Sequence, residues 1–382
     1  MNLKNINIDK TKHATMAVYF IGGFGAASWA PLVPILKVRL AIGEDVLGML
    51  LLCIGIGSLL TMPLSGAAAM RFGCRRVLAF AGAAYALLLL ALANLPSFTL
   101  AVPALLIFGA IMGCIDVVVN IEAVILEKAA GRRLMSSMHA LWSVGGFAGA
   151  GLFGLWTGTF GLTPVISTFI ATAIMVALTA IFWRNLLPYG GSSGGSLIAI
   201  PHGIVTFIGI IALVSFLVEG AIMDWSGVFL TTTRDLPMSL AGSGFTIFSL
   251  AMLLMRLVGD KIIERLGQRR VIIGGTTLAL IGFMLIIFAE DMMPLYVGFF
   301  LIGVGMANVV PVFFSMLGRQ NVMPVSMAVP AVSTLGYLGI LMGPATIGFI
   351  AHATSLYISF MMLSALVALQ LVIEWIVMKK MA

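Results

Sequence analysis

The segment 113-GCIDVVVNIEAVILE-127 places Asp116, Asn120, Glu122 and Glu127 at the end of a long apolar run. On an α-helix, Asp116, Asn120 and Glu127 fall within about 40° of one another, so they form one polar stripe, and Glu122 faces elsewhere. A charge at the centre of a bilayer costs about 3 kcal/mol or more, so the stripe must face a cavity or another helix. Desolvation stabilises the protonated form of a carboxyl in such a wall. Asp116 could therefore take up a proton on one side of a membrane and release it on the other.

Each of these side chains also fits a structural role. Asp116 could be an acid paired with a fixed donor, and Glu127 could be a solvated charge at the end of the helix. Glu122 could pair with His139, one turn into the next helix, or with a basic loop residue. A Glu122–His139 pair would be either a gate or a structural hydrogen bond. We rank Asp116 first as proton carrier and expect Asn120 to contact a solute or orient the helix.

A second pair of acids, Glu219 and Asp224, lies in the apolar run 216-FLVEGAIMDWSGVFL-230. The two are about 140° apart on a helix, so they cannot face the same way. Glu219 is the deeper of the two, and we expect it to be a second site for proton coupling or solute binding. Asp224 lies nearer the outer end, where pairing with a basic residue would give it a structural or gating role.

Four further side chains are candidates for contact with a solute, namely Trp29, Trp142, Asn308 and Tyr337. Aromatic rings and amide groups suit a polyol, because such a molecule presents both C–H faces and hydroxyl groups. Each of the four, taken alone, is also typical of ordinary helix packing. Together with Asn120 they form the set that we expect to bind substrate.

The composition indicates a membrane protein. Of 382 residues, 61% are hydrophobic and 9% are charged, whereas a soluble globular protein carries roughly a quarter charged residues. A membrane-spanning helix needs about 20 apolar residues, and twelve stretches meet that requirement while leaving no room for a sizeable soluble domain. The stretches are 14–38, 46–70, 77–95, 98–126, 135–158, 162–183, 203–230, 239–259, 271–289, 294–318, 325–350 and 357–378.

The basic residues indicate the orientation of these spans. If the N-terminus is cytoplasmic, only Lys37, Arg39 and Arg234 of the 21 Lys and Arg residues fall on the outer side. Cytoplasmic loops carry the excess of Lys and Arg, so we expect both termini in the cytoplasm. This distribution accounts for the net charge of +7 without a nucleic-acid partner.

The sequence contains no pattern for nucleotide or metal binding. The three cysteines suggest neither a disulfide framework nor a metal site. No Walker loop, zinc pattern or dinucleotide fingerprint is present. The first apolar stretch is too long for the core of a cleavable signal peptide. We therefore expect no cofactor, no metal, no enzymatic activity and no ATP-driven transport by this chain.

The chain nearly repeats itself at an offset of 194 residues. The basic loop 70-MRFGCRRVL-78 matches 264-ERLGQRRVI-272, and the glycine series 145-GGFAGAGLFG-154 matches 339-GILMGPATIG-348. Glycines at such spacing let helices approach closely. Two six-helix halves with substrate bound between them are a known transporter plan. The expected parts are an N-terminal bundle at 1–183, a flexible cytoplasmic Gly/Ser linker at 184–202 and a C-terminal bundle at 203–382.

The basic loops resemble a loop of the major facilitator superfamily, roughly G-x-x-x-D-R-x-G-R-R. The matching segments are 66-GAAAMRFGCRR-76 and 260-DKIIERLGQRR-270, in which Met70 replaces the acid of the first half and Glu264 keeps that of the second. The loops would contact each other or helix ends and stabilise one state of the transporter. The loop residues given structural or gating roles are Arg71, Arg75, Glu264, Arg265 and Arg269.

Four other segments are similar to the MosC/YbjJ-type branch of that superfamily, which is related to fucose permeases. They are 116-DVVVNIE-122, 138-MHALWSVGGFAGAG-151, 219-EGAIMDW-225 and 335-LGYLGILMGP-344. The resemblance implies an all-α membrane protein with twelve helices in two pseudo-symmetric six-helix bundles. It also implies that Asp116 is the proton site, because the fucose-permease pattern has an acid followed four residues later by Asn.

These features together predict a secondary active transporter of a small polar solute. We expect a sugar-like or cyclitol-like substrate, coupling to protons, and alternating access in a monomer in the lipid bilayer of the bacterial inner membrane. One alternative is a proton-coupled exporter of drugs or metabolites. The other is a membrane sensor that transports nothing.

Overall fold

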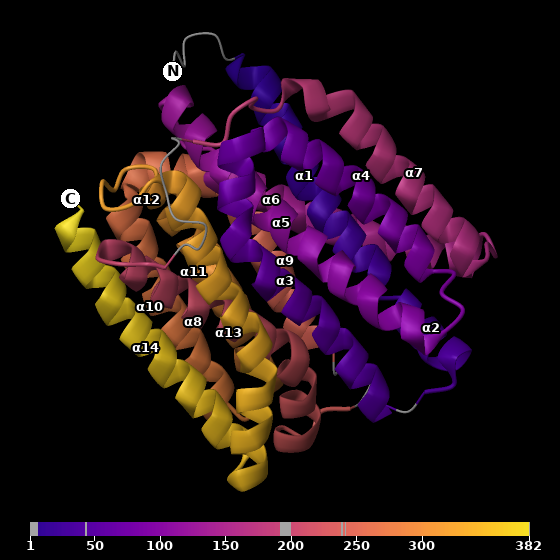
Figure 1. The fold of residues 1–382 in the computed structure, drawn as a ribbon. Coiled ribbons are helices and arrows are strands. Elements are labelled where there is room, and N and C mark those ends of the chain that lie inside the picture. The colour runs from indigo at the N-terminus through magenta and orange to yellow at the C-terminus, as the bar shows by residue number, and fades with distance from the viewer. Residues whose placement is uncertain (1–6, 43, 192–199, 238–239, 241, 382) are drawn as a thin grey trace. The chain divides into compact units, whose positions relative to one another are not determined.

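The computed structural model describes residues 7–42, 44–191, 200–237, 240 and 242–381, and the regular structure in these residues is helical (Figure 1). The helices are α1 Ile8–Trp29, α2 Leu32–Leu40, α3 Glu44–Phe72, α4 Cys74–Leu92, α5 Phe98–Ala130, α6 Met135–Gly154, α7 Pro164–Phe182, α8 Ile204–Val228, α9 Ser243–Leu266, α10 Gln268–Phe288, α11 Met292–Met306, α12 Val309–Leu317, α13 Val325–Ala353 and α14 Leu356–Lys380.

Ten helices of the described residues are long and apolar enough to cross a membrane. They include α5 and, taken as one stretch, α11 with α12. The helices α1 and α9 are not among the ten. Both contain charged residues, such as Asp9 and Lys10 in α1 and Asp260 and Lys261 in α9. The chain is thus a multi-helix membrane protein, and the count of twelve spans stays a prediction.

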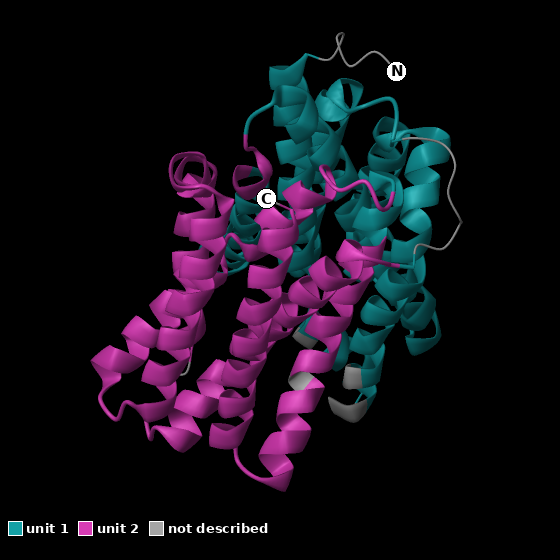
Figure 2. Cartoon of the chain, turned by 90° about the vertical axis from the view of Figure 1, so that its left-hand side faces the viewer, with its two compact units in different colours: residues 1–132, 138–200, 324–330 teal, residues 133–137, 201–323, 331–382 magenta. Residues whose placement is uncertain are grey.

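The chain divides into two compact units (Figure 2). Unit 1 comprises residues 1–132, 138–200 and 324–330, and unit 2 comprises 133–137, 201–323 and 331–382. The core of unit 2 contains the stacked rings of Phe229 and Phe360, with centroids 4.3 Å apart. Within unit 1, the rings of Tyr85 and Phe108 stack at 4.6 Å.

The internal repeat extends to the backbone of the two basic loops. Gly73, between α3 and α4, has φ 81° and ψ 150°, and Gly267, between α9 and α10, has φ 82° and ψ 149°. Side chains rarely allow a positive φ, so glycine is required at both turns. The glycine series also acts alike in the two units. A Cβ at Gly145 would meet the main chain of Phe20 in α1, and one at Gly339 would meet that of Leu213 in α8.

Two of the expected spans are interrupted. The stretch 14–38 breaks into α1 and α2 at Ala30 and Pro31, where proline supplies no N–H for the helix. The stretch 294–318 breaks into α11 and α12 at Ala307 and Asn308. There the carbonyl of Ala307 accepts a hydrogen bond at 3.1 Å from the Nε of Arg256. Each of these two expected spans therefore consists of two helices.

The segment expected to be a flexible linker is partly packed. Leu186 and Leu187 are each 2% exposed, and their carbonyl oxygens accept hydrogen bonds at 2.8 Å from the side chain and the main chain of Arg75. Gly190 packs against the main chain of Ala69 in α3. The residues 186–191 therefore form a strap on unit 1 and not a free tether. The Gly/Ser run at 192–199 lies outside the described residues, as does Lys4 of the expected cytoplasmic charges.

Candidate functional site

A hydrogen-bonded polar cluster lies inside unit 1 around Asn120 of α5, which is 1% exposed. The side-chain oxygen of Asn120 accepts a hydrogen bond at 2.7 Å from the hydroxyl of Tyr19 in α1. Nε2 of His139 in α6 lies 3.2 Å from the same oxygen, and the rings of Tyr19 and His139 are 5.1 Å apart. Three helices thus place polar groups on one amide. We call Tyr19, Asp116, Asn120 and His139 the Asn120 cluster.

Asp116 lies one turn before Asn120, as the helix period predicts. The Nδ2 of Asn120 donates to the Asp116 carboxylate at 3.3 Å and to its main-chain carbonyl at 2.8 Å. Asp116 is half-buried. Glu127 is only 7% exposed, so it is not the solvated charge at the helix end that the sequence allowed. The helix α5 continues to Ala130 and thereby keeps this carboxyl inside the protein.

Glu122 faces away from this cluster, as expected, but its hydrogen-bond partners were not predicted. It is 0% exposed, and its Oε1 accepts hydrogen bonds at 3.2 Å from the Thr15 hydroxyl and from the main-chain N–H of Leu187. Its Oε2 has no hydrogen-bond partner in the described part of the chain. The pair with His139, one of the two partners considered for Glu122, does not form, because that ring lies against Asn120. Glu122 instead anchors the strap 186–191.

The candidate aromatic residues of unit 1 are engaged in packing. Trp29 is 7% exposed and lies against the ring of Phe108, with centroids 6.0 Å apart. Trp142 is half-buried, and its side chain occupies the space beside Gly22 of α1. These contacts leave only the partly exposed face of Trp142 for another molecule.

The main polar cluster of unit 2 is charged. Arg256 of α9 is 6% exposed, and its guanidinium lies 3.7 Å from the Glu219 carboxylate of α8. Its Nε donates to the carbonyl of Ala307. Arg256 is one of the basic residues expected on the cytoplasmic side, but its side chain is buried within unit 2 and is no free loop charge. We call Glu219, Arg256 and Ala307 the Arg256 cluster.

The remaining candidates of unit 2 differ in exposure. Asn308 is 2% exposed, and neither its side-chain nitrogen nor its oxygen has a hydrogen-bond partner among the described residues. It packs against Gly259 of α9. Tyr337 is half-buried on α13, and Asp224 is exposed on α8. No ion pair involving Asp224 is seen within the described residues, so the pairing expected for it lacks support.

The two basic loops present most of their charges at the surface. Arg71 is exposed and lies over the ring of Phe72 at 5.3 Å, whereas Arg75 is half-buried on the strap. The corresponding residues Arg265 and Arg269 are exposed. Glu264 is also exposed and accepts a hydrogen bond at 3.4 Å from the main chain of Arg133, in the part of unit 2 that precedes α6.

A third buried carboxyl was missed in the sequence. Glu374 of α14 is 0% exposed and accepts hydrogen bonds at 2.7 Å from Gln370 and from the Thr276 hydroxyl of α10. The signal was available, because an acid inside an apolar helix is by default a candidate for function. Tyr19 was also missed. Its only signal in the sequence is a hydroxyl group within an apolar helix.

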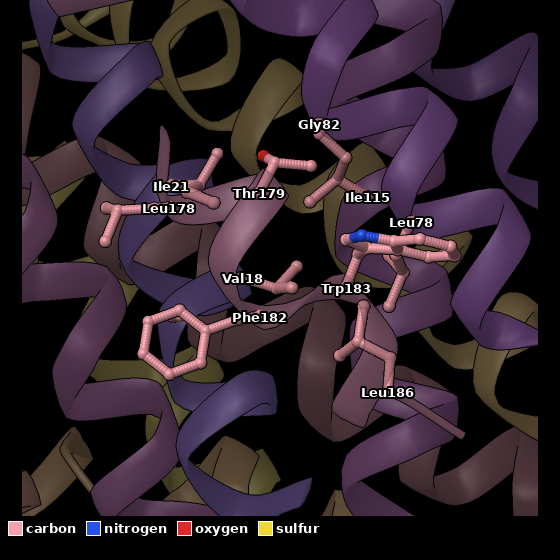
Figure 3. A pocket seen from close by; sticks show the side chains of 11 residues that line it. Val18, Ile21, Leu78, Gly82, Ile115, Leu178, Thr179, Phe182, Trp183 and Leu186 are labelled. Carbon is pink, nitrogen blue, oxygen red and sulfur yellow. The ribbon is translucent and has the colours of Figure 1, made fainter. Parts of the chain in front are cut away.

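Cavities within the units differ greatly in size. A cavity in unit 1 has a volume of about 10 Å³ and lies among Val18, Ile115, Thr179 and Leu186 (Figure 3). That volume holds about one water molecule, so this cavity cannot bind a solute. A cavity of about 390 Å³ lies in unit 2 and includes Asn308. No group of three His, Cys, Asp or Glu residues able to hold a metal ion is found in the part of the chain that the structure describes.

Comparison with known proteins identifies the family. The model of the Major Facilitator Superfamily matches residues 208–380. An MFS-type transporter of Yersinia pestis is 47% identical over 352 residues, which cover 91% of this chain and 90% of that protein. The chain belongs to the Major Facilitator Superfamily. The membrane protein MosC of Rhizobium meliloti is 30% identical over 341 residues, or 88% of this chain and 83% of MosC.

Solved transporters share the fold. FucP in its outward conformation has a TM-score of 0.78 at 14% identity, covering 96% of this chain and 98% of its own. The xylose symporter XylE has a TM-score of 0.70 at 14% identity, covering 96% and 95%. At these identities the likeness shows the fold alone. The similarity to MosC confirms the MosC-type branch that the motifs indicated.

Proposed function

We propose that the chain is a proton-coupled secondary transporter of a small polar solute, sugar-like or cyclitol-like, that works by alternating access. The observation that carries the proposal is the Asn120 cluster, in which a buried amide joins the Asp116 carboxylate to the polar tips of Tyr19 and His139. In the same fold, FucP is a fucose:proton symporter and XylE a proton:xylose symporter. The proposal is supported by the fact that each of these two proteins transports a sugar together with a proton.

The topology belongs to the same proposal. We infer twelve spans with both termini in the cytoplasm, in a monomer of the bacterial inner membrane. The bundles would run over 1–183 and 203–382, with 184–202 between them. The excess of Lys and Arg on one side supports the orientation. The matched backbone of Gly73 and Gly267 supports two homologous halves.

Asp116 would carry the proton, and the hydrogen bonding of Asn120 would change with the protonation state of Asp116. When Asp116 is ionised, its carboxylate accepts the N–H of Asn120, and hydrogen bonds to ionised groups are the stronger kind. Protonation weakens that bond and frees the amide N–H for a solute hydroxyl. His139 and Tyr19 hold the amide oxygen in place meanwhile. Solute binding and protonation would then favour each other, as symport requires.

Glu219 would play a different part from Asp116. Glu219 lies beside the Arg256 guanidinium with a third of its side chain exposed, so it is a second candidate for hydrogen bonding to solute hydroxyls. Of the expected solute contacts, Trp142 and Tyr337 remain candidates, and Trp29 would shape the wall, whereas Asn308 lines a separate groove of unit 2. Arg71, Arg75, Glu264, Arg265 and Arg269 would stabilise one conformation through the loops that hold them.

The test is transport by purified protein in proteoliposomes, with a panel of sugars, cyclitols, organic acids and dyes. Solute-driven entry of protons, read by an internal pH dye, supports symport. Extrusion of dye or metabolite in exchange for protons would support the exporter instead. Absence of flux for every panel member, with protein that remains folded, would contradict transport and favour a sensor. Empty liposomes provide the control for leak.

A further inference from the structure

The cavity of about 390 Å³ in unit 2 is a lateral groove outside the clusters described above. Its walls are α9 and α10, and its floor is the end of α11. Gly274 of α10 is exposed there, and a Cβ at this position would meet no atom within 4 Å. Leu266 on one wall is 52% exposed and Leu278 on the other is 37% exposed. The groove is therefore open, and its volume falls in the range of about 300–1,000 Å³ that small-molecule sites occupy.

The polar groups of the groove lie together at one end. The helices α10 and α11 are antiparallel, because Gly282 faces Gly298 and Gly275 faces Gly305 across the same contact. Asn308 lies three residues after Gly305. On the antiparallel helix α10 it is therefore level with position 272, three residues before Gly275. Arg270 is two residues from that position. At 1.5 Å rise per residue, Arg270 and Asn308 are separated by only about 3 Å along the helix axis.

Asn308 requires a partner that the described residues do not provide. It is 2% exposed and lines the groove, yet both polar atoms of its side chain are without a hydrogen bond. Buried amides are nearly always hydrogen-bonded. Arg270 adds an exposed positive charge at the same end. Beyond this end the lining is apolar, with Met255, Leu278 and Val304.

We propose that this groove binds one anionic phospholipid of the surrounding bilayer. The phosphate would lie on Arg270, the glycerol ester oxygens on the Asn308 amide, and an acyl chain along Met255, Leu278 and Val304. Along a phospholipid, the charged phosphate is followed by the ester oxygens and then by the acyl chains. The groove presents the matching groups in the same order, from Arg270 through Asn308 to the apolar residues. The neighbouring exposed charges of Arg265 and Arg269 attract the same headgroup. A polar solute would leave the apolar length of the groove unmatched.

The internal repeat supplies a blocking variant and a matched control. At the offset of 194 residues, Gly274 corresponds to Phe80 and Arg270 to Arg76, which is also exposed. Gly274→Phe therefore gives unit 2 the residue that unit 1 has at the equivalent position. The new side chain would extend into the open groove and block it. Arg76→Gln removes an equivalent charge away from the groove. Elution of each variant as a single monodisperse peak would establish that it is folded.

The experiment is native mass spectrometry of the detergent-solubilised chain, titrated with phosphatidylglycerol, phosphatidylcholine or inorganic phosphate. We expect one tight phosphatidylglycerol molecule in the wild type and in Arg76→Gln. Its affinity should fall about fivefold or more in Arg270→Gln, and the tight site should be lost in Gly274→Phe. Equal phosphatidylglycerol binding by wild type and Gly274→Phe would overturn the proposal. Competition by inorganic phosphate alone, or equal affinity for phosphatidylcholine, would overturn it as well.

Discussion

The two units hold their principal acids in different ways. In unit 1, the Asp116 carboxylate accepts a hydrogen bond from the neutral amide of Asn120, which is bonded in turn to Tyr19 and His139. In unit 2, Glu219 lies 3.7 Å from the guanidinium of Arg256, which also holds the carbonyl at a helix break. Asp116 thus contacts a neutral amide, whereas Glu219 lies beside a permanent cation. On this difference we base the proposal that proton exchange belongs to unit 1 and that unit 2 holds a fixed charge pair.

The largest expected effect comes from Arg256→Ala. The change leaves the Glu219 carboxylate without its cation and the Ala307 carbonyl without its donor. Removing one partner of a fully buried ion pair costs about 3–5 kcal/mol. The Glu219 side chain is 33% exposed, so the cost should be smaller here, but the thermal unfolding temperature in detergent should still fall clearly. The Glu219→Gln control should fall less, because Arg256 retains the Ala307 carbonyl. If Arg256→Ala unfolds at the same temperature as the wild type, the Arg256–Glu219 pair does not stabilise unit 2.

Glu122→Ala tests an acid of unit 1 that is held by a main-chain donor. Removal of its carboxylate leaves the N–H of Leu187 unbonded, at a cost of about 1–3 kcal/mol. Amide hydrogen exchange at residues 186–191 should therefore accelerate about tenfold or more. Glu374→Ala, at the buried acid of unit 2, is the matched control and should leave that exchange unchanged. Equal protection of the strap in both variants would show that Glu122 does not anchor it.

Tyr19→Phe removes one hydroxyl from the Asn120 cluster and keeps the ring. The lost hydrogen bond to Asn120 contributes about 1 kcal/mol, so solute affinity in a proteoliposome uptake assay should fall about fivefold. Tyr296→Phe removes a hydroxyl from α11 in unit 2 and serves as control. If both variants bind solute as the wild type does, the cluster does not orient Asn120 for the solute.

The smallest effect is expected at the ion pair of Arg132 and Asp9. The two side chains are 51% and 76% exposed and lie 3.1 Å apart. Exposed pairs contribute about 0–1 kcal/mol, so Arg132→Ala should change the unfolding temperature by no more than about a degree or two. A loss as large as that of Arg256→Ala would show that burial does not distinguish the two ion pairs.

The sequence predicted those features that depend on helix period and composition. The adjacency of Asp116 and Asn120, and the different direction of Glu122, follow from 3.6 residues per turn. The match of Gly73 with Gly267 follows from the repeat. The family followed from short motifs and was confirmed by relatives that cover most of the chain.

The features that sequence reasoning missed depend on distant partners. Tyr19 bonds to a residue 101 positions away, and Glu122 bonds to Leu187 at a separation of 65. Periodicity within one helix contains no information about such contacts. At the helix break, the Ala307 carbonyl likewise accepts a hydrogen bond from Arg256 of another helix. Glu374 is different, since its position inside an apolar helix was sufficient to mark it.

The most direct test of the account is proton-driven accumulation by Asp116→Asn, with the solute found in the proteoliposome panel. The amide is close in size to the carboxyl and cannot carry a proton. We expect accumulation driven by a pH gradient to disappear, while exchange of labelled for unlabelled solute continues at no less than about a tenth of the wild-type rate. Normal accumulation by Asp116→Asn would contradict the assignment of proton exchange to unit 1.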